Sequence, residues 1–270
     1  MRRGSGVEDS VMGVGLLAGA ANVIMQLSRP GVGYGVVESR VDSGNLFKRP
    51  VKRTRTTITY IAVATLGTDE ERRAYRRAVN AQHAQVRSTE RSPVSYNAFD
   101  PELQLWVAAC MYKGIEDVHR LFRDISDPAE LDEIYRFSAP LGTTLQVRED
   151  MWPADRAEFD RYWNAQLDEV HIDDTVRELL HDVAALKFLP KPLSAAFGPL
   201  NVFLTTGFLP PRFREEMRLP WTSRDQARFD RIIEVLSAVL GRSPRPLRRF
   251  PFNLLLWDLR VRMRRGMPLA

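Results

Sequence analysis

The sequence predicts an all-α fold, built as a single multi-helix domain, on three observations. Apolar residues recur at helical spacing in one segment after another, and Pro and Gly divide these segments. Several segments begin with Asp-Pro, or with Thr followed three residues later by Glu, which are typical helix starts. No series of short strands, internal repeat or long low-complexity linker is present, so neither a β-fold nor a second core is indicated.

The first segment, residues 11–27, is apolar and follows two arginines. Ala18 and Ala20 would suit a signal-peptide cleavage site, but Glu8 and Asp9 stand where such a peptide needs positive charge. The segment is also short and rich in glycine for a membrane span. We therefore expect a helix of the domain itself.

The next two segments are less clear. Residues 30–35 contain three glycines, but no βαβ pattern and no Gly-Lys-Ser/Thr accompany them, so we expect a helix–helix connection rather than a phosphate-binding loop. Residues 49–66 change from basic to apolar, and their β-branched residues leave helix and strand both open. Gly67 ends this segment.

Later helix starts are clearer. Thr68 and Glu71 predict a capping box, and the helix that follows carries Tyr75, Val79 and His83 on one apolar stripe. Asp-Pro pairs predict further helix starts at residues 100–101 and 127–128. The remaining amphipathic segments are 154–167, 175–186, 193–206, 224–240 and 251–265. Gly241 is in position to end the fourth of these as a C-terminal cap.

Composition limits the chemistry. With 44% hydrophobic and 27% charged residues among 270, the chain should fold. Cys110 is the only cysteine, which excludes an intramolecular disulfide and any site of two or more thiolates, and favours a reducing, cytoplasmic compartment. The four histidines form no pair at helical spacing, and no H-E-x-x-H or G-x-S-x-G motif occurs. A metal site made of protein side chains alone, or a hydrolase, is therefore not expected.

The last thirty residues are rich in arginine, interleaved with Phe, Leu and Trp. The simpler interpretation is a final helix with one solvated face and one buried face. Peripheral contact with a membrane is the alternative. Nucleic acid is not an expected partner, because no recognised docking motif accompanies the arginines.

His83 has two interpretations. A lone histidine among apolar residues is most often a core residue hydrogen-bonded to a carbonyl. It is also what a haem protein needs, because the iron of a porphyrin requires a single imidazole and an apolar slot for the macrocycle.

The chain resembles the family of MpaB and the latex-clearing (rubber) oxygenases. The resemblance extends over about residues 20–265, after an N-terminal extension at 1–19, and we assign 20–270 to the domain. The segments that carry it are "MQLSRPGVGYGV" (25–36), "RTRTT" (53–57), Gly67, "AQHAQVRS" (81–88), "YNAFDPELQLWVAA" (96–109), "WPADRAEFDRYW" (152–163) and "LPPRFREEMRLPW" (209–221).

The resemblance implies a helical fold with a globin-like core, a haem b cofactor and dioxygen-dependent oxidation of a lipophilic, often isoprenoid, substrate. It implies that His83 is the proximal iron ligand. It also implies that Arg53 and Thr57, on the family pattern Arg-x-x-Lys/Arg-Thr, are catalytic residues on the distal side or bind the haem propionates. Two departures alter the expected site: Thr56 replaces the distal lysine of rubber oxygenases, and Ala108 stands where many relatives have histidine.

The sequence therefore predicts an oxidoreductase, a haem-b-dependent oxygenase that acts on an unsaturated hydrophobic compound with dioxygen. The alternative is a non-catalytic haem- or lipid-binding helical protein. Both hypotheses leave the oligomeric state open.

Overall fold

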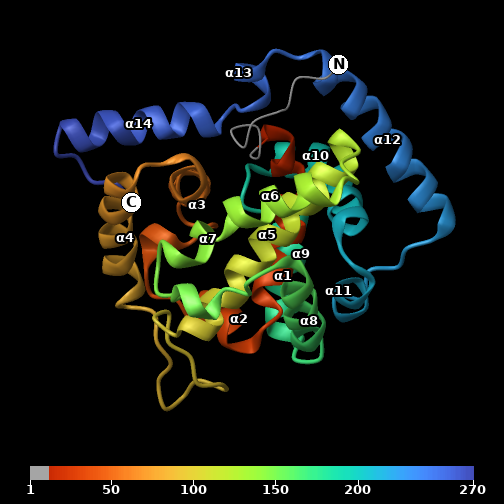
Figure 1. Ribbon diagram of the computed structural model, residues 1–270. Helices are drawn as coiled ribbons and strands as arrows, with labels where there is room; N and C mark the ends of the chain where they lie inside the picture. The colour runs from red at the N-terminus through yellow and green to blue at the C-terminus, as the bar shows by residue number, and fades with distance from the viewer. Residues whose placement is uncertain (1–11) are drawn as a thin grey trace.

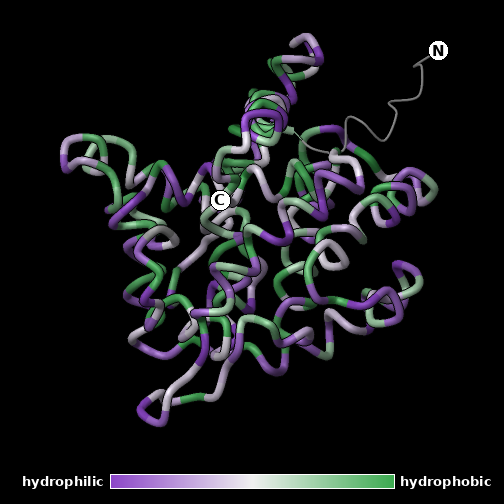
Figure 2. Tube along the Cα trace, turned by 90° about the vertical axis from the view of Figure 1, so that its left-hand side faces the viewer, coloured by the Kyte–Doolittle hydropathy of each residue, from purple (hydrophilic) through white to green (hydrophobic). Residues whose placement is uncertain are grey.

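The longest helix, α5, lies at the centre of the molecule and the other helices pack around it (Figure 1). The computed structural model describes residues 12–270. Within that range there is no strand, and the β-type pairing is one isolated bridge between Arg87 and Asn97. Hydrophilic and hydrophobic residues alternate along the helical turns, as amphipathic helices require (Figure 2). The all-α prediction is confirmed. The globin-like arrangement stays an expectation.

The helices follow one another with short connections. In chain order they are η2 (Gly13–Ala18, a 3-10 helix), α1 (Gly19–Leu27), α2 (Pro30–Val37), η3 (Asp42–Gly44), α3 (Pro50–Leu66), α4 (Asp69–His83), α5 (Pro101–Arg123), α6 (Pro128–Ser138), α7 (Pro140–Thr143), η4 (Glu149–Met151), α8 (Arg156–Leu167), α9 (Asp174–Ala184), α10 (Lys191–Phe208), α11 (Pro211–Glu216), α12 (Ser223–Arg242), α13 (Arg245–Arg248) and α14 (Phe252–Arg264).

The helix starts predicted from capping residues are confirmed. Thr68 accepts a hydrogen bond from the Glu71 amide at 3.3 Å, and the Glu71 carboxylate accepts one from the Thr68 amide at 2.8 Å. Asp100 accepts from the amides of Glu102 and Leu103. The Asp127 side chain caps α6 in the same way. Each cap satisfies amides that a helix cannot pair internally.

The segment 49–66, which could have been helix or strand, is helix α3. Pro50 occupies its first turn, where a missing amide hydrogen has no cost. Ile58, Ala62 and Val63 are buried in a cluster with residues of α14. Tertiary burial therefore outweighs the modest strand preference of the β-branched residues.

Two predictions about glycines are wrong. Residues 30–35 do not form a connection but lie within helix α2. A Cβ on Gly33 would lie 2.8 Å from the Leu27 carbonyl oxygen and 3.1 Å from Val176, so glycine serves close packing here. Gly241 is not a cap either, because α12 continues to Arg242 and Gly241 does not have a positive φ.

Buried side chains form a large and a small cluster. The large one surrounds α5 and contains a set of mutually packed aromatic rings, with Tyr112 and Phe159 at a centroid distance of 4.6 Å. The small one joins α3, α4 and α14 through residues such as Tyr75 and Leu259. Figure 1 shows α14 running across α3 beside α4. The candidate site described below lies beside this small cluster.

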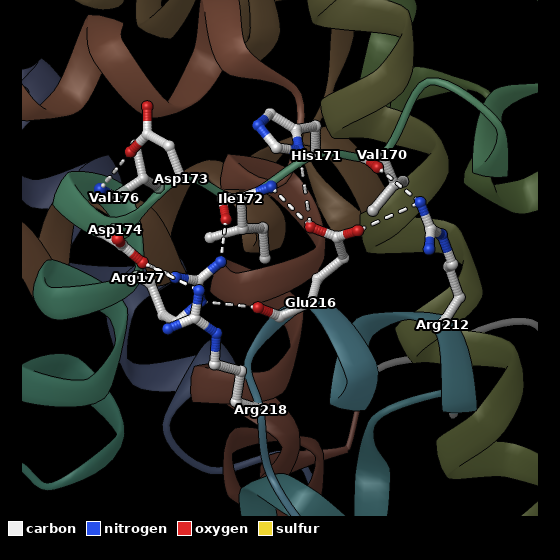
Figure 3. A network of polar contacts seen from close by, with 10 residues as sticks. All are labelled: Val170, His171, Ile172, Asp173, Asp174, Val176, Arg177, Arg212, Glu216 and Arg218. Atoms are coloured by element: carbon white, nitrogen blue, oxygen red, sulfur yellow. Dashed lines mark hydrogen bonds and ion pairs between the residues drawn. The ribbon is translucent and has the colours of Figure 1, made fainter.

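The segment 209–221, one of those that carry the family resemblance, contributes to a network of polar contacts that Figure 3 shows. The Glu216 carboxylate, on α11, accepts a hydrogen bond from the Ile172 amide at 2.9 Å and pairs with Arg212 at 3.1 Å. Arg177 of α9 donates to the Glu216 carbonyl oxygen at 2.7 Å. These contacts fasten α11 to the start of α9.

Residues 1–11 of the expected N-terminal extension lie outside the described residues. From Met12 onward the chain packs on the domain, since η2 contacts α5 and α10 and the side chain of Met12 is buried. Helix α1 is deeply buried as well, with Ile24 fully covered. Among the described residues, no helix combines the length and the apolar character that crossing a membrane requires.

Candidate functional site

The candidate site is formed by the helices α3 and α4. A connection of only two residues, Gly67 and Thr68, joins them, and the two helices contact each other. Arg53 lies in the first turn of α3 and His83 is the last residue of α4, so the hairpin brings both residues to its open end. The Tyr75 hydroxyl of α4 donates to the Thr56 carbonyl oxygen of α3 at 2.8 Å and links the helices.

His83 is half-buried and uncharged at neutral pH. Its ring packs edge-to-face against Phe99, with the centroids 6.4 Å apart. The Nδ1 atom is buried and has no hydrogen-bond partner. Burial, and then the positive charge of Arg53, lower the pKa of the imidazole to about 4. A neutral imidazole has a lone pair available for a metal ion.

The side chain of Arg53 is accessible to solvent, and yet desolvation by the surrounding protein lowers the pKa of its guanidinium. The two observations are compatible if protein surrounds the side chain without covering it. No carboxylate of the described residues forms an ion pair with Arg53. Its neighbour Arg55, by contrast, contacts Asp258 at 3.4 Å. The guanidinium of Arg53 therefore keeps its capacity for an anionic group.

Thr57 lies one turn after Arg53, on the same face of α3. Its side chain is exposed. The adjacent Thr56, at the position of the lysine in rubber oxygenases, differs: its hydroxyl donates to the Lys52 carbonyl oxygen at 2.7 Å. The structure thus brings Arg53 and Thr57 together on one face and His83 close to Arg53, whereas the Thr56 hydroxyl bonds within its own helix.

Two tyrosines near these residues, Tyr60 and Tyr75, were not predicted from the sequence to belong to the site. The Tyr60 hydroxyl donates to the Leu141 carbonyl oxygen at 2.6 Å, and its ring lies 6.5 Å from that of Tyr75. Burial raises the pKa of both hydroxyls, so both remain protonated. Tyr60 lies at i+3 from Thr57, so helical spacing could have revealed it.

Hydrogen bonds among the side chains of Asn80, Gln104 and Gln146 hold the last turn of α4. This network was not predicted from the sequence. The Gln146 side chain donates to Asn80 at 2.9 Å, and Gln104 of α5 donates to Gln146 at 2.6 Å. The Gln146 backbone amide donates in turn to the Gln104 side chain at 2.9 Å. Because Asn80 lies one turn before His83, this network fixes the helix end that carries the imidazole.

Ala108, where many relatives have histidine, belongs to the core. It is fully buried, and a Cβ on Gly142 of α7 would lie 3.3 Å from the Ala108 Cβ. An imidazole at this position would need space that α7 occupies. Where many relatives have histidine, this chain therefore has an alanine that is closely packed against α7.

The described residues contain no group of three or more His, Cys, Asp or Glu that could hold a metal ion. Haem, in contrast to such a site, requires only one protein ligand. The fold and this hairpin define the class: an all-α protein with one histidine available as a ligand.

The chain belongs to the family described as "ER-bound oxygenase mpaB/B'/Rubber oxygenase, catalytic domain", which matches residues 10–238. It is 54% identical over 251 residues to the uncharacterized protein Rv2237 of Mycobacterium tuberculosis, and equally to the uncharacterized protein Mb2261 of Mycobacterium bovis. Each alignment covers 93% of this chain and 98% of the relative. No solved structure is significantly similar to the chain.

Proposed function

We propose that the protein is a haem-b-dependent oxygenase that oxidises an unsaturated hydrophobic substrate of isoprenoid or lipid type with dioxygen. Membership in a family of oxygenase catalytic domains supports the oxygenase part. One observation carries the haem part: a neutral, half-buried imidazole at His83 lies near the accessible guanidinium of Arg53, which has no carboxylate partner among the described residues.

Side chains of the α3–α4 hairpin offer the chemistry that haem binding requires. The imidazole of His83 has no internal hydrogen bond at its buried Nδ1 that would have to be broken before the ring could turn toward a ligand. Arg53 offers a planar fork for a propionate, and Thr57 on the same face offers a hydroxyl. Haem, when bound, supplies the binding and activation of dioxygen.

The protein's own residues would bind the cofactor and shield it. His83 would hold the iron, and Arg53 would neutralise a propionate charge. The protonated hydroxyls of Tyr60 and Tyr75 are engaged with backbone carbonyls, so they brace α3 against α4 and α7 rather than transfer protons. The buried Cys110 fits a reducing compartment, and we propose a cytoplasmic protein.

The test is an absorption spectrum of the protein reconstituted with haemin, before and after dithionite. We expect a strong band near about 400–420 nm that shifts on reduction, as is general for haem proteins. His83→Ala should abolish or loosen binding while the helical circular dichroism persists. His171→Ala, at an exposed histidine, is the matched control.

Arg53 provides a second test of the same proposal. Arg53→Ala should weaken haem retention more than Arg53→Lys, because a lysine keeps the charge. Equal haem binding by wild type and His83→Ala would refute the ligand assignment. A colourless protein that carries lipid would favour the lipid-binding alternative.

A further inference from the structure

The end of the chain exposes large apolar side chains beside arginines. We call this surface the α13–α14 face and define it by the four exposed apolar residues of α13, α14 and their connection. They are Leu247 (62% exposed), Phe250 (53%), Leu254 (48%) and Trp257 (59%). Leu254 and Trp257 are one helical turn apart, so they lie side by side on α14.

Leu254 and Trp257 do not lie on the side of α14 that faces the core. Phe252, Leu256 and Leu259 form that side, and they are buried in the small cluster with residues of α3. Helix α14 therefore carries apolar side chains on two sides, and Leu254 and Trp257 on the outer side remain exposed. Exposed apolar side chains that lie side by side, as Leu254 and Trp257 do, are typical of an interaction surface.

The segment that carries this face is also rich in positive charge. Residues 241–270 contain eight arginines and one aspartate, a surplus of seven charges, whereas the whole chain has a formal charge of only +5. The single aspartate, Asp258, already pairs with Arg262 at 2.7 Å and with Arg55. Arg264 and Arg265 are exposed, and no carboxylate of the described residues pairs with them. The basic character of the chain is thus concentrated here.

Trp257 is the most exposed of the five tryptophans. Trp106, Trp152 and Trp163 are buried, and Trp221 is partly buried in contact with Phe203. An indole combines an apolar body with an N–H donor, which suits the boundary between lipid headgroups and acyl chains.

We propose that the α13–α14 face docks on a lipid surface that carries anionic headgroups. Leu247, Phe250, Leu254 and Trp257 insert at the headgroup level, and the arginines contact lipid phosphates. A second copy of the chain is a poor occupant, because a symmetric contact would place two arginine-rich faces against each other. Nucleic acid is a poor occupant because no recognised docking motif accompanies the arginines in the sequence.

The inference stands on this face alone and does not require haem. If the proposed function also holds, docking has a consequence for it, because α14 packs directly on α3, which carries Arg53. A lipophilic substrate dissolved in the bilayer would then lie close to the site. The face lies beyond residue 238, where the match to the oxygenase family ends.

The test is co-sedimentation of the full chain with vesicles, combined with tryptophan fluorescence. Vesicles of phosphatidylcholine mixed with phosphatidylglycerol should bind the protein and shift its emission to the blue, whereas phosphatidylcholine alone should do so weakly. Binding should weaken as salt is raised, because salt screens the arginines. Equal binding to both vesicles, or no binding at low salt, would overturn the proposal.

Single substitutions test whether the α13–α14 face is the surface that binds the vesicles. Arg264→Ala and Arg265→Ala should each weaken binding about fivefold, since each arginine near an anionic surface contributes about 1 kcal/mol. Leu254→Ser should reduce binding, and Val36→Ser, at an exposed position on α2, should not. Trp257→Phe should keep binding but lose most of the fluorescence shift.

The same experiments would show whether the α13–α14 face binds another partner instead of lipid. If Leu254→Ser and Val36→Ser bind vesicles equally, the face is not the docking surface. Self-association that Leu254→Ser abolishes, or salt-sensitive binding to nucleic acid with no binding to vesicles, would replace the proposal. All measurements are made with haem-free and haem-loaded protein, so a failure to bind haem stays distinguishable from a failure to bind lipid.

Discussion

His83 and Arg53 influence each other through charge as well as position. Burial disfavours the protonated imidazole, and a guanidinium nearby disfavours it further. A core histidine usually satisfies its nitrogens with hydrogen bonds, but Nδ1 of His83 is buried without a partner. An unsatisfied buried polar atom costs about 1–3 kcal/mol, so the position is not explained by stability.

The coupling between the two residues can be measured without any cofactor. Arg53→Ala should raise the pKa of His83 above its value of about 4, because a repelling charge is removed, while burial still keeps the pKa below 6.5. Arg53→Lys should leave the pKa nearly unchanged. Histidine ring resonances followed by NMR through a pH titration would report it, with His83→Gln to assign the signal. An identical pKa in wild type and Arg53→Ala would show that the charges do not interact.

His83 should also make stability depend on pH. In the unfolded chain the imidazole takes up a proton near pH 6.5, but in the folded protein only near pH 4. Between these values acid therefore favours the unfolded state, and the stability difference between wild type and His83→Gln should change as pH falls from about 6.5 to about 4. Above about pH 6.5 the two thermal unfolding curves should keep a constant separation. A constant separation across the acid range as well would contradict the lowered pKa.

The individual helices show which structural features can be predicted from the sequence and which cannot. Caps are local, because Thr68 and Glu71 are three residues apart, and these starts were predictable. Helix α2 was missed because Gly33 is explained by contacts with Leu27 and Val176, the second of which is distant in the chain. In α3, the choice between helix and strand depended on burial against α14, also from far along the chain.

The same contrast applies to the site. Helical spacing predicts that Arg53 and Thr57 share a face and that His83 lies on the apolar stripe of α4. The amides that hold this helix end could not be predicted, since Gln146 is 66 residues from Asn80 and 42 from Gln104. Long-range pairing of neutral polar side chains leaves no periodic trace in one sequence.

Two glycine substitutions should have opposite effects. Gly33→Ala should destabilise the protein by about 1–3 kcal/mol, because its Cβ would meet backbone and side-chain atoms of other elements. Gly241→Ala should stabilise it by about 0.5–1 kcal/mol, because the position is inside α12 with open space around it. Urea denaturation measures both. A destabilising Gly241→Ala would mean that this glycine ends the helix after all.

At the scale of the whole molecule, α14 packs against the two helices that form the candidate site. Its Arg260 pairs with the Glu71 carboxylate at 2.7 Å, and the same carboxylate caps α4 through Thr68. Burial opposes ionisation of Glu71, but Arg260 and the cap together lower the pKa of the carboxyl. The last helix therefore contacts both α3 and α4, the two helices that carry Arg53 and His83.

This arrangement predicts that the inner and outer sides of α14 have separable roles. Leu259→Ala, at a side chain 1% exposed, should lower the free energy of unfolding by roughly 2–4 kcal/mol, the usual cost of a buried leucine. Leu254→Ala, on the outer side, should change it by less than about 0.5 kcal/mol. Urea denaturation gives both values, and hydrogen exchange should show faster exchange of α3 amides in Leu259→Ala alone.

Measuring how strongly the same two variants retain haem would test whether α14 also affects the candidate site. If α14 holds α3 in position, Leu259→Ala should also release haem more readily, whereas Leu254→Ala should retain haem and lose only affinity for vesicles. A Leu259→Ala protein with unchanged exchange in α3 would show that α14 is bound to α3 without stabilising it. The site would then depend on the α3–α4 hairpin and on the contacts of Tyr60 and Gln146 alone.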